Sequence, residues 1–151
     1  MKVLQDSIEV KVMPEKIFDW LLHLEEHYRE WHPDHVICSW AKGGPGKEGS
    51  VLYIEEYVHK DLHKMEFCLT KIEPARKIEY NILFPTSILC PKGSFIIEPK
   101  NGSCIFTATL SFRFGTLLSH LFKKRVEALR THMKEEGENL KKLLEKSKDK
   151  D

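Results

Sequence analysis

The sequence predicts an α+β fold in which a curved antiparallel sheet of about six to seven strands wraps around a long C-terminal helix. Between residues 50 and 112, short apolar runs alternate with turn signals, which is typical of consecutive antiparallel strands. Beyond Gly115, apolar residues recur every three to four positions, which indicates one long helix. A sheet with one apolar face has to bury that face, and only this helix is long enough to cover it. A cavity between sheet and helix is the expected result.

The chain is expected to begin with a strand and two short helices. Ser7–Val12 alternates polar and apolar residues, as a half-buried strand does. Pro14 suits the first position of a helix, because its missing N–H would be unpaired there in any case. Glu25–Trp31 is expected to form a second short helix or a broken continuation of the first, and Pro33 would stop it.

Six further strands follow. A strand over Val36–Trp40 precedes a glycine-rich loop, and Asn101-Gly102 is a two-residue hairpin signal, since a type I′ turn needs positive φ at both central positions. The later strands are expected over the runs Val51–Val58, His63–Ile72, Lys77–Leu83, Gly93–Glu98 and Cys104–Phe112.

The long helix is expected from about Thr116 to about Lys146. Its apolar stripe consists of Leu118, Phe122, Val126, Leu129, Met133, Leu140 and Leu144. Gly137 lies in that stripe, where a glycine costs about 1 kcal/mol relative to alanine. It therefore predicts either a close approach to the sheet or room for a ligand. The tail Lys146–Asp151 alternates charges and is expected to fray.

Composition narrows the class of protein. The length fits a single domain over residues 1–151, and the formal net charge of +1 argues against a nucleic-acid binder. No apolar run reaches the roughly 18 residues of a membrane span, and the first residues lack the core of a signal peptide, so a cytoplasmic protein is expected. The four cysteines are widely spaced, which favours reduced thiols over disulfides or a zinc cage.

Two of the eight histidines lie at the entrance of a predicted strand. His32 and His35 flank Pro33-Asp34, and a loop held by proline can aim an imidazole into a cavity. The alternative is a polar loop whose histidines face water.

A carboxylate lies inside the following strand. Alternation puts Leu52, Ile54, Glu56 and Val58 on one face, so Glu56 would point into the cavity among aliphatic neighbours. A lone buried carboxylate is costly unless it is paired or binds a metal. Glu56 could instead lie near the sheet edge or pair with a Lys or Arg, and Glu55 takes its place if the faces are reversed.

His132 and Glu136 are four residues apart on the long helix and therefore lie on one side of it, bordering the apolar stripe. Such pairs arise often by chance in a chain with 31% charged residues. With His35 and Glu56, however, they offer two imidazoles and two carboxylates. That set suits a divalent metal such as zinc.

The order of elements resembles the helix-grip fold of the START-like superfamily, which includes the birch-pollen-allergen-like proteins and polyketide cyclases. The segment Ile8–Trp20 is similar to the first strand and helix of that superfamily. The resemblance covers essentially the whole chain. It implies a hydrophobic or aromatic small molecule as ligand in the cavity.

Three motifs resemble the diacetylphloroglucinol hydrolase branch of that superfamily. They are Tyr-x-x-Trp-His-Pro-Asp-His from Tyr28, the Glu-Tyr that begins at Glu56, and His-x-x-x-Glu from His132. These hydrolases cleave the carbon–carbon bond between an acyl group and an aromatic ring with a zinc held by two His and two Glu. The resemblance implies His35, Glu56, His132 and Glu136 as metal ligands, and Tyr28 near a pocket tyrosine.

Two functions follow as hypotheses. In the first, zinc polarises a ligand carbonyl and activates water, Tyr28 or His32 donates or relays a proton, and an aryl ketone or β-diketone is hydrolysed. In the second, the protein is a carrier that performs no chemistry, and the presence of a metal distinguishes the two. We expect Trp31, Trp40, Met133 and Gly137 to line the cavity. A homodimer is compatible with either hypothesis.

Overall fold

The computed structural model of this protein describes residues 2–113 and 120–148. Its seven-stranded antiparallel sheet has the order β1-β7-β6-β5-β4-β3-β2. The strands are β1 (Lys2–Val10), β2 (His35–Lys42), β3 (Val51–Val58), β4 (Asp61–Glu73), β5 (Lys77–Ile82), β6 (Lys92–Lys100) and β7 (Ser103–Phe112). The helices are α1 (Pro14–Leu22), α2 (Leu24–Trp31), the short 3₁₀ helix η1 (Thr86–Ile88) and α4 (Lys123–Lys148).

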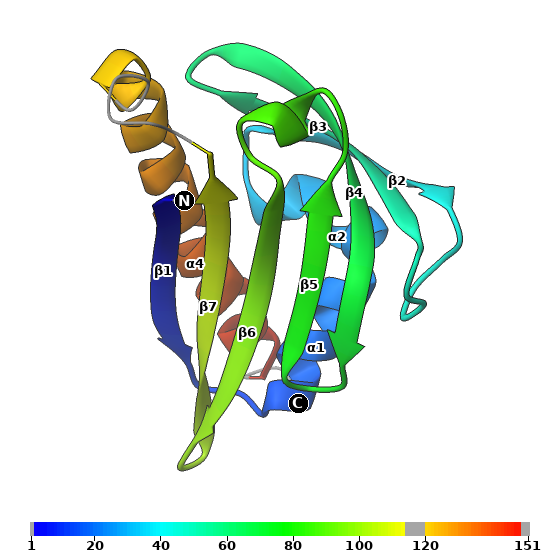
Figure 1. Ribbon diagram of the computed structural model, residues 1–151. Coiled ribbons are helices and arrows are strands. Elements are labelled where there is room, and N and C mark those ends of the chain that lie inside the picture. The colour runs from blue at the N-terminus through cyan, green and yellow to red at the C-terminus, as the bar shows by residue number, and fades with distance from the viewer. Residues whose placement is uncertain (1, 114–119, 149–151) are drawn as a thin grey trace.

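The sheet curves around the helices, which confirms the predicted α+β fold (Figure 1). Helices α1, α2 and α4 lie on one side of the sheet, with α4 packed along the edge strand β1 and α2 against the opposite edge strand β2. The two edges of the sheet are therefore each covered by a helix, and the space between α4 and the middle strands becomes the cavity.

The stripe on α4 forms much of the core. Val126, Met133, Leu140 and Leu144 are buried, and Phe122 and Leu129 pack at its border. The start of this helix as expected from the sequence, including Thr116 and Leu118, falls outside the described residues. At its other end the described helix extends to Lys148, and the rest of the tail that was expected to fray lies outside the described residues.

The first strand differs from its expected position. It begins at Lys2 and ends at Val10, because residues 2–10 pair continuously with β7 from Phe112 back to Cys104. The hairpin between β6 and β7 is as predicted, since Lys100 pairs with Ser103 and Gly102 has a φ of 80°. Among the other boundaries, β4 starts earlier than expected, at Asp61.

Gly137 marks a close approach of α4 to the sheet. A Cβ atom at this position would lie 3.3 Å from Asp6 Oδ2 and 3.4 Å from Ile8 Cγ2. The first of the two expected reasons for this glycine therefore applies. Gly137, which was expected to line the cavity, faces Asp6 and Ile8 of the edge strand β1 and is not among the residues in the cavity wall.

The cysteines are free, as expected. Burial raises the pKa of the Cys38 and Cys90 thiols to about 12, so both thiols stay protonated and weakly reactive at neutral pH. No helix within the described ranges 2–113 and 120–148 is long and apolar enough to cross a membrane.

Candidate metal centre

A β-bulge turns His35 toward the cavity. His35 pairs with Glu56 and Ile37 pairs with Glu55, so Val36 is an extra residue in β2. In a regular strand, Val36 would share the inward face with Cys38 and Trp40, and His35 would point outward. The bulge shifts the alternation by one residue and gives His35 the inward position opposite Glu56.

Glu56 is the carboxylate of β3 that faces the cavity. Its neighbours on the same face, Leu52 and Ile54, are buried, and all three line the cavity wall. Glu55 points to the other face, where its carboxylate accepts a hydrogen bond of 2.8 Å from the hydroxyl of Tyr53. The face assignment made from the alternation of β3 is therefore correct.

Four donor atoms from three segments converge. His35 Nε2 lies 2.8 Å from Glu136 Oε2, 3.3 Å from His132 Nε2 and 3.5 Å from Glu56 Oε2. His132 Nε2 lies 3.5 Å from each of the two carboxylate oxygens. The side chains are exposed by 0% for His35, 5% for His132, 13% for Glu56 and 17% for Glu136. These atoms all lie within 4.8 Å of one another.

The hydrogen bonds around His35 determine what its Nε2 atom can offer. Its Nδ1 lies 2.8 Å from the backbone carbonyl oxygen of Tyr28, which only accepts, so Nδ1 carries a proton. In the neutral ring, Nε2 therefore presents a lone pair to the two carboxylates and to His132. Such a convergence of lone pairs requires protons or a cation to hold it together.

Without a metal, protons provide that charge. Burial alone would lower the pKa of His132, but hydrogen bonds with Glu136 and Glu56 outweigh burial and raise it to about 10. Burial would raise the pKa of Glu136, but hydrogen bonds from His132 and His35 lower it to about 2. The cluster therefore favours a positive charge at its centre, next to two carboxylates.

The separations of the donor atoms fit a small tetrahedral shell. Zinc bonds of about 2.0–2.1 Å imply distances of about 3.3–3.4 Å between neighbouring ligand atoms. Four of the five separations given above are 3.3–3.5 Å, and only the His35–Glu136 pair, at 2.8 Å, would have to open. Residue types and distances thus both fit a divalent ion such as zinc.

The structure places the two candidate proton donors differently. Tyr28 is buried, stacks on the His35 ring at 3.8 Å and donates a 2.8 Å hydrogen bond to Glu56 Oε2. His32 is also buried, yet it does not line the cavity: its Nδ1 accepts the amide N–H of Asp34 at 2.9 Å, and its ring lies against His132. His32 therefore lies beside His132 and is not among the residues that line either part of the cavity.

The cavity between α4 and the sheet consists of two chambers. The inner chamber, of ≈ 80 Å³, contains Glu56, His132 and Glu136 in its wall, together with the expected residues Trp31, Trp40 and Met133. The outer chamber, of ≈ 180 Å³, lies toward the start of α4. Both chambers are bordered by Glu56, Phe67, Leu110 and Leu129, so Glu56 lies at their junction.

Two wall residues were not recognised from the sequence. His63 pairs across the strands with Glu56 and borders the outer chamber. Tyr80 is buried in the inner chamber and stacks on Phe67 at 4.7 Å. The register between β3 and β4 would have revealed His63, but register depends on pairing that the sequence of one strand does not show.

A curved antiparallel sheet that holds a long helix over a mainly apolar cavity defines a small-molecule-binding protein of the helix-grip class. The chain belongs to the family described as polyketide cyclase / dehydrase and lipid transport, which it matches over residues 1–145. Among curated proteins, none matches this sequence significantly.

Solved structures share the fold at low sequence identity. The aromatase/cyclase Zhui from Streptomyces sp. R1128 has a TM-score of 0.71 at 13% identity, covering 95% of this chain and 93% of that one. Norcoclaurine synthase from Thalictrum flavum, in complex with dopamine and hydroxybenzaldehyde, has a TM-score of 0.73 at 13% identity, covering 96% and 87%. The di-domain aromatase/cyclase BexL has a TM-score of 0.74 at 14% identity, covering 95% of this chain and 50% of that one. These similarities show the fold alone.

Proposed function

We propose that this protein is a metal-dependent hydrolase that cleaves the carbon–carbon bond between an acyl group and an aromatic ring, or the equivalent bond of a β-diketone. One observation carries the proposal: two imidazole nitrogens and two carboxylate oxygens, from segments far apart in sequence, converge within 4.8 Å. Nitrogen and oxygen donors in this number and spacing suit zinc. The resemblance of the three motifs to diacetylphloroglucinol hydrolases supports the same reaction.

The ligands His35, Glu56, His132 and Glu136 would hold the ion at the wall of the inner chamber. Three of them border the chamber, so a molecule in the cavity can reach the site, unlike a closed structural zinc site. When bound, a divalent ion supplies Lewis-acid polarisation of a carbonyl and lowers the pKa of water toward about 7.

The reaction needs a proton at the ring carbon. Water supplies the hydroxyl that forms the new bond to the acyl carbon, the bond to the ring breaks, and the electron pair left on the ring carbon takes up a proton. Burial, followed by the charges of Glu56 and Glu136, raises the pKa of Tyr28 far above its ordinary range. Tyr28 therefore keeps its proton at neutral pH and is the donor nearest to the cluster.

The remaining wall binds and shields an apolar molecule. The inner chamber is lined mostly by aliphatic and aromatic side chains, among them Leu52, Ile54, Phe67 and Phe95. Such a wall excludes water from the reacting bond and favours an aromatic ring.

The same apolar wall supports a second candidate, a carrier that binds a hydrophobic or aromatic molecule without chemistry. The carrier needs the cavity but not the metal. Metal content and turnover therefore separate the two functions.

Elemental analysis of freshly purified protein tests the proposal. We expect about one zinc per chain in the native protein. The control variant His120→Ala, which alters an exposed histidine just before α4, should bind the same amount. His35→Ala and His132→Ala should lose the metal. Loss of absorbance of an acylphloroglucinol then reports turnover. A metal-free native protein contradicts the proposal, and a zinc-loaded protein without turnover on aryl ketones or β-diketones favours the carrier.

A further inference from the structure

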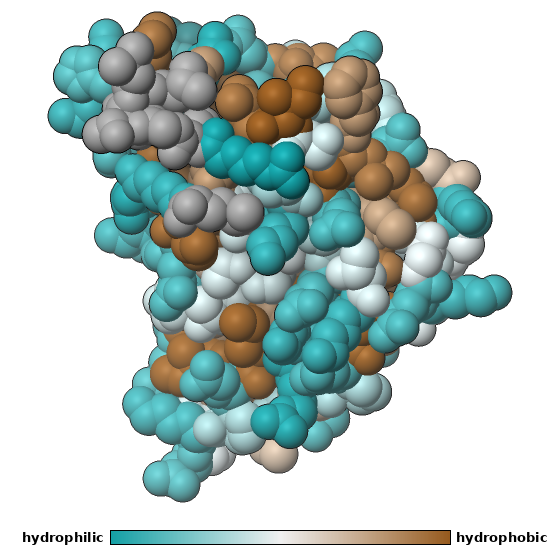
Figure 2. All heavy atoms as spheres, viewed as in Figure 1, coloured by the Kyte–Doolittle hydropathy of each residue, from teal (hydrophilic) through white to brown (hydrophobic). Residues whose placement is uncertain are grey.

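The outer chamber opens at the end of the molecule where the β3–β4 turn, η1 and the start of α4 meet. It is the larger of the two chambers, ≈ 180 Å³ against ≈ 80 Å³. A cavity of about 150 Å³ holds one benzene molecule, so the outer chamber has room for an aromatic ring. Figure 2 shows hydrophobic residues gathered at this end, where Leu83, Phe84, Ile88 and Leu89 are exposed.

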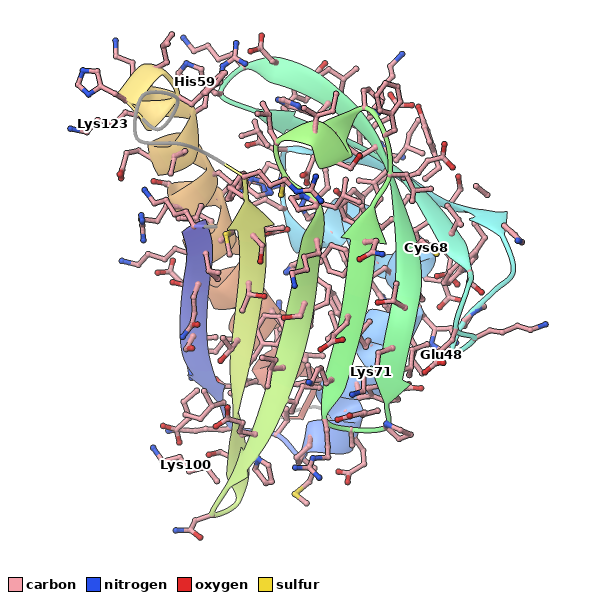
Figure 3. All side chains as sticks on the ribbon, in the orientation of Figure 1. Glu48, His59, Cys68, Lys71, Lys100 and Lys123 are labelled. Carbon is pink, nitrogen blue, oxygen red and sulfur yellow. The ribbon has the colours of Figure 1, made fainter. Side chains whose placement is uncertain are left out.

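Most of the polar groups of this chamber are nitrogen donors. Its wall is apolar except for Glu56, which faces the metal cluster, Thr86, and three nitrogen donors, His59, His63 and Arg125. The guanidinium of Arg125 is charged at every accessible pH and offers a planar fork of donors. Figure 3 shows His59 and Lys123 at this same end, so the Lys123 ammonium adds a positive charge there.

Arg125 is available to a ligand. Its Nη2 atom lies 3.8 Å from Asp61 Oδ2, beyond hydrogen-bond distance, and both side chains are more than half exposed. The Arg125 guanidinium also lies 5.8 Å from the centre of the Phe122 ring, which borders the chamber. This loose ion pair leaves most of the guanidinium donors free for an anion that enters the chamber.

The turn that carries His59 is strained. His59 and Lys60 have φ values of 53° and 68°, so both central residues of this two-residue hairpin turn are left-handed. Asn-Gly is the usual choice for such a turn, and other residues cost about 1 kcal/mol or more each. Strain of this kind persists at functional sites, and here it holds His59 at the opening.

We propose that the outer chamber binds an aromatic ligand that carries an anionic end group, with Arg125 as the main recognition residue and His59 and His63 as further hydrogen-bond donors. The ring would occupy the apolar wall, and the anion would lie at the opening. This inference rests on the proposed function, because it takes the ligand of the outer chamber to be the substrate of the proposed hydrolase. Binding of the ligand does not require the metal.

Two dyes with one skeleton test the inference. 8-Anilinonaphthalene-1-sulfonate carries an anionic group, and N-phenyl-1-naphthylamine is the same skeleton without it. Fluorescence titrations are made on the full chain after removal of metal with EDTA. Arg125→Gln should weaken binding of the sulfonate by about tenfold and change binding of the neutral dye by less than about twofold. Arg130→Gln, an exposed arginine of α4 that is outside the chamber, is the matched control and should change neither.

A second variant locates the dyes. Thr86 borders the chamber, and Thr86→Phe should fill it and weaken both dyes. The inference is overturned if Arg125→Gln weakens binding of the two dyes equally or leaves both unchanged. It is also overturned if Thr86→Phe leaves binding of the dyes unchanged. Because these titrations contain no metal, their outcome is independent of the hydrolase proposal. The dyes can bind as expected in a protein that proves to hold no zinc, and they can fail to do so in a protein that holds zinc.

Discussion

The Nε2 atoms of His35 and His132 lie 3.3 Å apart, although 97 positions separate the two residues in the sequence. One residue belongs to the edge strand β2 and the other to α4. Trp31 links the two regions, since its Nε1 donates to the carbonyl oxygen of Glu136 at 2.8 Å and its own carbonyl accepts Asn139 Nδ2 at 3.0 Å. The cluster of His35, Glu56, His132 and Glu136 therefore depends on the docking of α2 on α4.

Zinc should stabilise the folded protein. Binding to the native state alone raises the free energy of unfolding by about 2.7 kcal/mol at a free metal concentration 100 times Kd, which is several degrees in Tm. Glu136→Gln removes a ligand charge and should abolish this increase. Glu138→Gln, an exposed neighbour, should keep it. Thermal unfolding followed by circular dichroism with and without zinc measures the effect, and an equal increase in both variants would contradict the assigned ligands.

Tyr28→Phe should separate chemistry from binding. The ring still stacks on His35, but the hydroxyl that donates to Glu56 is lost. We expect kcat to fall by about 10²–10⁴, the usual contribution of a general acid, with zinc content unchanged. Tyr57→Phe, at an exposed position, is the control. If Tyr28→Phe retains native kcat, the proton comes from another group.

The effect of a substitution at Gly137 on stability should depend on the size of the new side chain. Alanine favours the helix by about 1 kcal/mol. Its Cβ would lie 3.3 Å from the end of the Asp6 side chain, which can rotate away, and 3.4 Å from Ile8 Cγ2, which is an ordinary van der Waals contact. Gly137→Ala should therefore change the free energy of unfolding by less than about 1 kcal/mol. Gly137→Leu should force β1 away from α4 and lower this free energy by about 1–3 kcal/mol in urea unfolding. Equal effects of the two substitutions would show that α4 does not approach β1 this closely.

Asp6 should make stability depend on pH. Partial burial raises the pKa of Asp6; Lys134 opposes this and Glu138 adds to it. Because the pKa of Asp6 in the folded protein is above its ordinary value of 3.8, the contribution of Asp6 to stability is fully present below that value and is lost as pH rises through the folded pKa. Asp6→Asn should therefore be more stable than the native protein at pH 7, and the difference should shrink below pH about 4.

Asp19→Asn is the control for Asp6, because Asp19 is 80% exposed. It should leave the free energy of unfolding within about 0.5 kcal/mol of the native value at both pH values. A native protein that is more stable than Asp6→Asn at pH 7 would contradict the raised pKa.

The spacing of apolar residues predicted most of the fold, because the helical and strand periods depend only on residues that are close in the sequence. The stripe from Val126 to Leu144 repeats at helical spacing, and the alternation in β3 correctly assigned Leu52 and Glu56 to the inner face. Boundaries were less well predicted. The strand β1 extends to Lys2 because it pairs with β7, and that pairing partner is about a hundred residues away.

The candidate site was also predicted only in part from the sequence. The sequence by itself determined the residue types and the local pairs: a histidine four residues before a glutamate on one helix, and a glutamate on the apolar face of one strand. Only the tertiary structure decided that the bulge at Val36 turns His35 inward, that the His32 ring lies against His132, and that His63 lies opposite Glu56. The physical reason is that spacing determines which side of its own element a residue occupies, whereas register, bulges and helix docking determine which elements face one another.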